Sequence, residues 1–246
     1  WGTLDYMMLA YLSFVLEEGM NMFVVGATAS GKTTTMNALT TFEMPDKKIV
    51  SIEDTPELQV PHQNWIRETT RESGGDKKGS DVGMFELLRA ALRQRPDRII
   101  VGEIRGIEAA IAFQAMQKGH GVISTFHASS VQKVIQRLTG EPINIPKAYV
   151  DSLDIVLIQS VVKAPGSTGT VRRVTSINEI VGYDPIDKAF SFIKAFDWNP
   201  ADDTFDFPGH MNSFLLEEKI AIRRGIPPFK KKAIYTDLKR RAKIFE

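Results

Sequence analysis

A phosphate-binding signature lies near the start of the chain. The segment from Gly26 to Thr33 reads GATASGKT and fits the pattern G-x-x-x-x-G-K-[ST]. Glycines let the backbone turn sharply, so that successive N–H groups converge on a phosphate at the positive end of the next helix. The pattern predicts a nucleotide site in which Lys32 neutralises the β and γ phosphates and the Thr33 hydroxyl ligates Mg²⁺. The expected nucleotide contacts are Gly26, Ala27, Thr28, Ala29, Ser30, Gly31, Lys32, Thr33 and Thr34.

Two acidic segments compete for the roles of holding the metal and activating water. Each follows a short apolar run, and parallel strands place their carboxyl ends at one ligand-binding edge of a sheet. The first segment would place Asp54 beside Thr33 at the metal. In the second, Gly102 stands where many phosphate-loop enzymes have a metal-holding acid, so Glu103 is expected to orient the attacking water. The candidates are Glu53, Asp54, Glu57 and Glu103. Alternatively, these carboxylates cap helices or pair with Arg67, Arg71, Arg95 and Arg105.

One histidine and two arginines could complete such a site. His127 follows another apolar run, so it could sense the γ phosphate or hydrogen-bond the water, although a loop histidine is also a common packing residue. Arg98 and Arg105 flank Glu103 in sequence and could stabilise charge in the transition state. Ordinary salt bridges are an equal alternative for either arginine.

Apolar runs alternate with amphipathic stretches along the first part of the chain. We expect strands at 22–25, 48–52, 98–101 and 122–125, and helices at 5–18, 31–41, 84–94, 107–118 and 131–138. Asp81 is the expected cap of the 84–94 helix, and Ser129 or Ser130 that of the 131–138 helix. This alternation predicts an α/β fold with a mostly parallel sheet covered by helices on both faces.

The pattern changes after residue 155. Runs at 155–162, 171–181 and 190–196 indicate strands joined by turns, and hence an antiparallel extension of the sheet. Residues 211–246 read as helical, and from 219 onward there are ten basic residues against two acidic ones. We therefore divide the chain into a core with its β extension, 1–210, and a basic helical tail, 211–246.

Composition excludes several classes of protein. The 246 residues hold 43% hydrophobic and 25% charged side chains, as in ordinary globular proteins. There are no cysteines, which rules out disulfides and thiolate metal sites. No apolar stretch reaches the ~18 residues that a bilayer span needs.

Four segments together resemble the type II/type IV secretion ATPase family. GATASGKTTTMNAL, SIEDTPELQ, LRQRPDRIIVGEIRG and GHGVISTFHASS are similar, in order and spacing, to its P-loop, Asp box, atypical acidic-strand motif and His box. The resemblance covers about 2–182. Farther on, INEIVGYDP and SFLLEEKIA look most like archaeal members, with the archaellum motor ATPase as first choice and an archaeal secretion or pilus-assembly ATPase next.

This resemblance implies a RecA-like core in a hexameric, Mg²⁺-dependent ATPase ring. Such a ring lies in the cytoplasm against the cell membrane and drives a filament through a polytopic membrane platform protein, with other cytoplasmic proteins of the filament machinery. Carried over by position, the family assigns phosphate and metal to Lys32 and Thr33, catalysis chiefly to Glu103, and phosphate sensing to His127. Assisting residues would be Glu53, Asp54 and Glu57, with Arg98 and Arg105 as further contributors.

The sequence also departs from the family pattern. From the resemblance we expect the family's usual N-terminal domain, which closes over the nucleotide, to be missing, and hence nucleotide to bind but turnover to be weak.

An alternative is a nucleic-acid-translocating or conjugation-type RecA-like ATPase, because the same core serves both. The basic tail offers only Phe229 and Tyr235 as aromatic residues, too few for a single-strand stacking platform, so no nucleic-acid partner is expected. Its composition fits a solvated helix or a contact with anionic lipid. A small-molecule kinase is disfavoured because no acceptor-binding lid is evident.

Overall fold

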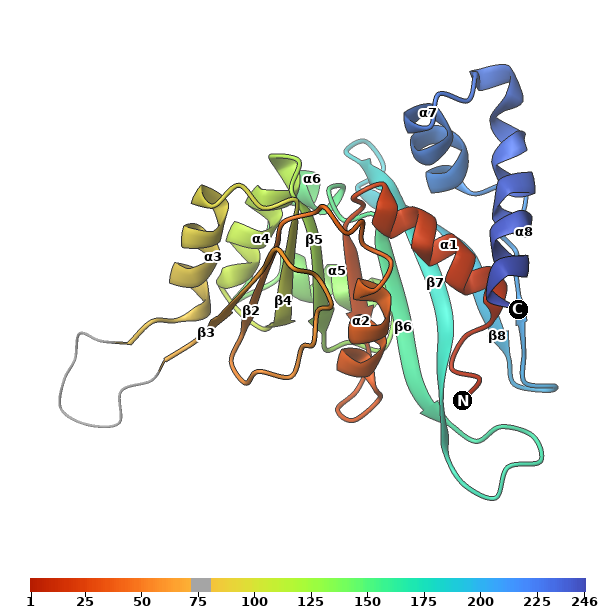
Figure 1. Cartoon of the computed structure of the whole chain (residues 1–246), viewed down its shortest axis with the longest axis horizontal. Coiled ribbons are helices and arrows are strands. Elements are labelled where there is room, and N and C mark those ends of the chain that lie inside the picture. Colours follow the sequence, from red (N-terminus) through yellow and green to blue (C-terminus); the bar gives the residue numbers. More distant parts are fainter. Residues whose placement is uncertain (72–80) are drawn as a thin grey trace.

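A single nine-stranded sheet organises the computed structural model, which describes residues 1–71 and 81–246. The strands lie in the order β3-β2-β4-β5-β1-β6-β7-β8-β9, and helices cover both faces of the first half (Figure 1). The predicted α/β class is confirmed.

The first six strands of this order are mutually parallel. Because they all run one way, the loops that follow them gather at one edge of the sheet, the carboxyl edge, and the loops that precede them at the amino edge. The strands are β1 (Met22–Val25), β2 (Ile49–Glu53), β3 (Trp65–Thr69), β4 (Arg98–Ile104), β5 (Gly121–Phe126) and β6 (Ile155–Val162).

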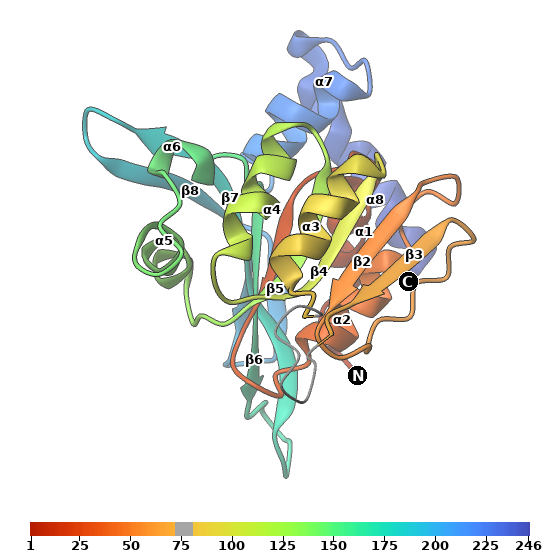
Figure 2. The same cartoon turned by 90° about the vertical axis from the view of Figure 1, so that its left-hand side faces the viewer.

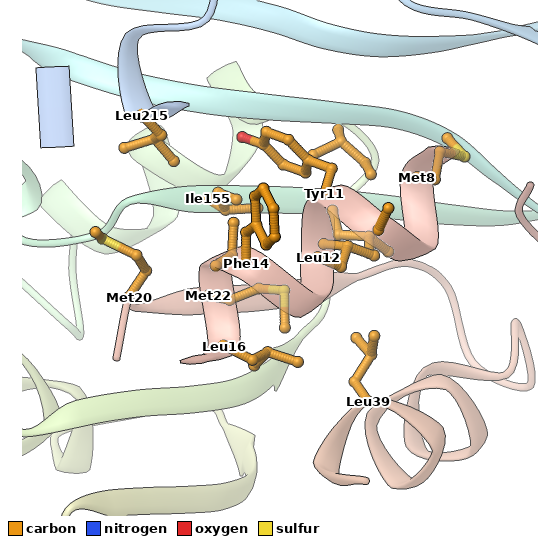
Figure 3. Close-up of a cluster of buried hydrophobic side chains, with 14 of the residues drawn as sticks. Met8, Tyr11, Leu12, Phe14, Leu16, Met20, Met22, Leu39, Ile155 and Leu215 are labelled. Carbon is orange, nitrogen blue, oxygen red and sulfur yellow. The ribbon is translucent and has the colours of Figure 1, made fainter. Parts of the chain in front are cut away.

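The helices divide between two hydrophobic clusters, one on each face of the sheet. α1 (Tyr6–Glu17) and α2 (Lys32–Thr40) pack on one face with Leu12, Phe14 and Leu39 (Figure 3). The other face is covered by α3 (Met84–Arg93), α4 (Glu108–Gln117), α5 (Val131–Thr139) and the short α6 (Lys147–Val150) (Figure 2). This arrangement buries every residue of β1.

The N-cap of α5 is a residue predicted from the sequence, whereas the N-cap of α3 is a different residue. Ser130 caps α5, because its side chain accepts from the Lys133 N–H at 3.2 Å. The prediction that Asp81 caps α3 is wrong. The cap is Gly83, whose N–H donates to Glu86 Oε2 at 3.1 Å, so a carboxylate in the first turn replaces the expected cap side chain.

The antiparallel extension is confirmed. β6 pairs antiparallel with β7 (Val171–Asp184), followed by β8 (Ala189–Asn199) and β9 (Thr204–Asp206). Since β6 is also the parallel neighbour of β1, this strand joins the extension directly to the helix-covered half of the sheet. Two strands, β3 and β9, were not predicted.

The C-terminal helices pack against α1 rather than standing alone in solvent. They comprise the π-helix η1 (Leu215–Ile220), α7 (Ala221–Arg223), the 3₁₀ helix η2 (Pro228–Ala233) and α8 (Ile234–Phe245). Figure 1 shows α8 beside α1, and Ile234, Tyr235 and Leu238 are buried there. Some of the basic residues also face α1: Arg224 and Arg241 both pair with Glu17 and lie over the Phe14 ring. No helix in the described ranges is both long and apolar enough to cross a bilayer.

A buried carboxylate ties these helices to the sheet. Glu179 of β7 is fully buried and accepts hydrogen bonds from Tyr11 Oη at 2.7 Å, Ser213 Oγ at 2.5 Å and the Leu215 N–H at 3.1 Å. Burial raises the pKa of Glu179, while these donors oppose the rise. One side chain thus links β7, α1 and the start of η1.

Candidate active site

The phosphate loop connects β1 to α2 at the carboxyl edge of the sheet. Gly31 has a φ of 94°, in the left-handed region that glycine adopts without strain. Gly26 is required for a different reason, because a Cβ there would lie 2.2 Å from the carbonyl oxygen of Gln159. The crest of the loop, Ala27 to Ala29, is exposed. The two glycines of the motif therefore set the turn of the loop and its close contact with β6.

Lys32 lies with its ammonium inside the loop. Its side chain is largely buried, and Nζ donates to the carbonyl oxygens of Gly26 at 3.1 Å and Ala27 at 2.9 Å. Burial lowers the pKa of Lys32, and the Glu103 carboxylate acts in the opposite direction. The predicted phosphate-binding cation and the predicted catalytic carboxylate therefore interact electrostatically.

A cavity of about 210 Å³ lies between the loop and the ends of β2, β4 and β5. It collects most of the residues predicted from the sequence as catalytic or metal-binding. Its lining consists of Thr33, Glu53, Asp54, Thr55, Glu57, Gly102, Glu103, Arg105 and Thr125. The two acidic segments that competed in the sequence thus contribute to the same cavity.

A β-bulge in β4 directs Glu103 into this cavity. Val101 pairs with Ser124, whereas Glu103 pairs with Thr125, so Gly102 is the extra residue. Adjacent residues of β5 point to opposite faces, and the bulge therefore places Glu103 on the face of Thr125. Thr125 Oγ1 donates to the Gly102 carbonyl at 2.6 Å and fixes the bulge. Gly102, at the position where many phosphate-loop enzymes have an acidic residue, thus forms the bulge that turns Glu103 toward the cavity.

Arg105 and His127 lie against the two carboxylate oxygens of Glu103. Oε2 accepts from Arg105, through Nε at 2.8 Å and through Nη2, and His127 Nε2 lies 2.8 Å from Oε1. Arg105 Nη1 also lies 3.9 Å from Asp54, and its hydrogen bond to Glu103 raises the pKa of Arg105. The Arg105 side chain is 67% exposed, so it covers Glu103 from the solvent side. The structure thus brings Glu103, Arg105 and His127 together. The salt bridge considered as an alternative role for Arg105 is present, and it lies within the site.

Glu53 supports the loop that carries Asp54. Its Oε1 accepts from the N–H groups of Glu57 and Leu58, both at 2.8 Å. Its Oε2 makes no hydrogen bond in the described part of the chain, although the side chain is 2% exposed; Arg67 Nε is 3.6 Å away. A buried oxygen that lines a cavity without a hydrogen-bond partner is a candidate for contact with a ligand. The exposed Asp54 accepts from Thr70 Oγ1 at 3.2 Å.

Arg98 does not belong to the site, and we correct that expectation. It begins β4 at the amino edge, the side of the sheet opposite Glu103, and is 1% exposed. Its Nε lies 2.5 Å from Glu43, and its two terminal nitrogens donate to the Met20 and Leu16 carbonyls at 2.7 and 2.8 Å. Both arginines flank Glu103 in sequence, but a seven-residue strand places Arg98 and Arg105 at opposite ends of β4.

Sequence reasoning missed several residues around the site. Arg137 of α5 donates to the His127 carbonyl and stacks on Phe126, with 5.0 Å from guanidinium carbon to ring centre. Gln159 and Arg172, from the β extension, donate to carbonyls of the phosphate loop. Gln159 had one usable signal, since it is a polar residue within the apolar strand IVLIQSVV. For Arg137 and Arg172 the sequence holds no such signal, because they cannot be told from other surface arginines.

The donors at the cavity fit a magnesium ion bound together with phosphate. The Thr33 hydroxyl, the Asp54 carboxylate and the free Glu53 oxygen are hard oxygen ligands, which Mg²⁺ prefers. Among the described residues, no group of three or more His, Asp or Glu side chains could hold a metal alone. This agrees with the habit of Mg²⁺ of taking few protein ligands and completing its shell with phosphate and water.

Comparison with known sequences identifies relatives. The model of the family described as "Type II/IV secretion system protein" matches residues 1–182. The uncharacterized protein MJ0900 of Methanocaldococcus jannaschii is 50% identical over 246 residues, covering the whole chain and 44% of that protein. A second uncharacterized protein of that organism, MJ1287, is 46% identical over 99% of the chain and 87% of its own length. The type IV secretion system protein PtlH of Bordetella pertussis is 39% identical over 68% of the chain and 52% of its own length.

Two solved structures share the fold. The VirB11 ATPase of the Brucella suis type IV secretion system, solved with sulphate, is 28% identical with a TM-score of 0.56, covering 67% of this chain and 50% of that one. The pilus retraction motor PilT, solved with bound ADP, is 29% identical with a TM-score of 0.53, covering 70% and 51%. The chain thus spans about half of either structure and of some relatives.

Proposed function

The chain belongs to the type II/IV secretion system protein family, and from this premise we propose that it is a Mg²⁺-dependent ATPase. The observation that carries the proposal is the position of Glu103, which lines one cavity with Thr33 and interacts with Lys32. A VirB11 protein named as an ATPase and a pilus motor with bound ADP support the choice of nucleotide.

The phosphate loop would bind the β and γ phosphates of ATP. Amides of the loop face the anion at the start of α2, and Lys32 transfers its hydrogen bonds from the Gly26 and Ala27 carbonyls to phosphate oxygens. Thr33, Asp54 and the free Glu53 oxygen would hold Mg²⁺. When bound, the ion neutralises phosphate charge during the reaction.

Glu103 would act as the general base. A water attacks the γ phosphorus, the bond to the bridging oxygen of ADP breaks, and the proton of the water passes to the Glu103 carboxylate. Arg105 and His127 hold this carboxylate in one orientation, as their contacts with separate oxygens indicate. Because Arg105 is exposed, its side chain can move away from Oε2, which then accepts the proton. The guanidinium can turn toward the transferred phosphoryl group.

The wider role that we propose follows the relatives. The chain would form the core of a hexameric motor, with residues 1–210 as the ATPase core and 211–246 as a basic tail. It would act in the cytoplasm at the inner face of the cell membrane, with a polytopic platform protein and other cytoplasmic filament proteins. The segments INEIVGYDP and SFLLEEKIA are the reason for proposing an archaeal filament system, with the archaellum motor first and a pilus or secretion system next.

The test is phosphate release from Mg-ATP by the purified chain and its Glu103→Gln variant. We expect hydrolysis by the wild type, a fall of about 10³-fold in the variant because the general base is lost, and unchanged ATP affinity. Glu141→Gln, whose carboxylate accepts from the exposed Asn144 amide at 3.2 Å, is the matched control and should hydrolyse normally. Undiminished hydrolysis by Glu103→Gln would refute this assignment.

A further inference from the structure

Two side chains from the β extension contact the outer side of the phosphate loop. In the parallel pair β1–β6, Val25 lies opposite Ile158, so the next residues, Gly26 and Gln159, are also neighbours. Gln159 is 1% exposed, and the register between β6 and β7 shifts at this point. Arg172 comes from β7, the following strand of the sheet.

Both side chains hold carbonyl groups of the loop. Gln159 Nε2 donates to the Ser30 carbonyl at 2.9 Å, while its Oε1 accepts from Thr35 Oγ1 at 2.7 Å. Arg172 Nε donates to the Ala29 carbonyl at 3.1 Å. A Cβ built on Gly31 would lie 2.9 Å from both Gln159 Nε2 and Arg172 Cδ, so the two side chains converge on that glycine.

The direction of a carbonyl fixes the direction of the next amide. In a planar trans peptide the C=O of one residue and the N–H of the next point to opposite sides. Holding the Ser30 carbonyl toward β6 therefore turns the Gly31 N–H toward the inside of the loop. Glycine allows many backbone conformations, so the peptide between Ser30 and Gly31 has little intrinsic preference. The reversed orientation would point a carbonyl oxygen at the phosphates.

We infer that Gln159 is a positioning residue that keeps the Ser30 carbonyl outside the phosphate loop, so that the Gly31 N–H faces the bound phosphate, and that Arg172 assists by holding the preceding Ala29 carbonyl. The inference rests on the proposed function and extends it to the β extension, which would then control how well the loop binds anions. Gln159 carries the larger share, because it is buried and its amide is fixed by a hydrogen bond at each end.

The test compares binding of Mg-ATP and of inorganic pyrophosphate by calorimetry. Pyrophosphate isolates the phosphate contacts from those of the nucleoside. We expect Gln159→Ala to weaken both affinities about tenfold, and Arg172→Ala about threefold, since each loses a hydrogen bond that orients the loop. Arg172→Lys should restore most of the loss because its ammonium remains a donor. The matched control is Asn178→Ala, which removes a buried amide of β7 that bonds to Ser176 at 2.9 Å and not to the loop.

The Gly31 amide resonance of protein labelled with ¹⁵N-glycine gives a readout that a loss of stability would not mimic. On adding pyrophosphate it should shift in the wild type and in Asn178→Ala, but not in Gln159→Ala. Gln159→Met, which keeps the volume without the amide, replaces the alanine variant if that one unfolds. Equal pyrophosphate affinity and an equal Gly31 shift in wild type and Gln159 variants would overturn the inference alone. Absence of ATP and pyrophosphate binding by the wild type would overturn the proposed function with it.

Discussion

The two edges of the parallel sheet use charged residues in opposite ways. At the amino edge, Arg98 and Glu43 are both nearly inaccessible and face each other at 2.5 Å. Beside them, Asp154 accepts from the Asn21 N–H at 2.8 Å and pairs with Lys219 at 2.5 Å. Arg98, Glu43 and Asp154 have little access to solvent, whereas the Lys219 side chain is 30% exposed.

The carboxyl edge keeps its charged groups available. Arg105 and Asp54 are exposed, and Glu53 has a buried oxygen without a hydrogen-bond partner among the described residues. β4 contributes to both edges, with Arg98 at its start and Glu103 near its end. The comparison teaches that the neighbours of a charged group, rather than its residue type, separate the ion pair that holds this fold from the groups that line the cavity.

The largest expected effect tests the amino edge. Arg98→Ala should lower the free energy of unfolding by about 3–5 kcal/mol, because it leaves Glu43 as a buried charge without its partner. ATP affinity of the folded protein should stay unchanged. Urea denaturation and calorimetry measure the two quantities. Arg98→Met combined with Glu43→Leu, which removes both charges, should recover part of the stability. A loss of ATP affinity in Arg98→Ala at full stability would return this arginine to the site and break the comparison.

A smaller effect, of opposite kind, is expected at the phosphate loop. Lys32→Ala should weaken ATP binding about 10- to 100-fold, because a charge-assisted hydrogen bond contributes about 1.5–3 kcal/mol. The free energy of unfolding should change little, since within residues 1–71 and 81–246 the ammonium donates hydrogen bonds to the Gly26 and Ala27 carbonyls of its own loop. Calorimetric titration with Mg-ATP provides the measurement, with the exposed Lys133→Ala as control. Unchanged affinity would place the nucleotide elsewhere.

The smallest effect sharpens the comparison within the carboxyl edge. Asp54→Asn should raise the Mg²⁺ concentration for half-maximal hydrolysis about two- to fivefold, because an exposed carboxylate contributes less than about 1 kcal/mol. A magnesium titration of phosphate release measures this, and Asp46→Asn, in the exposed turn after α2, is the control. A shift beyond 100-fold would contradict a minor role and make Asp54 a principal ligand of the ion.

Much of the fold and of the cavity was predictable because the signals were local. The buried runs of β1, β2 and β5 and the amphipathic faces of α3 and α5 define elements that depend on their own residues. The loops after parallel strands share one edge by topology, which brought Glu53, Asp54 and Glu103 together as expected.

Features that depend on distant partners were not predictable. β3 reads WIRET and is largely exposed, so its strand state comes from pairing with β2 at the edge of the sheet rather than from apolar periodicity. The bulge at Gly102 depends on pairing with β5. The burial of the Arg98 side chain depends on its ion pair with Glu43, which lies far away in sequence. The tail looked solvated because its buried Tyr235 and Leu238 are outnumbered by lysines and arginines.

The unbroken hydrogen bonding from β3 to β9 has a mechanical consequence. Because every strand is hydrogen-bonded to its neighbours, the sheet resists bending between the nucleotide cavity and the hairpins of β7, β8 and β9. A displacement of β1 at the nucleotide cavity would therefore be passed through β6 to β8 and β9, and any bending would fall in the loops rather than in the sheet.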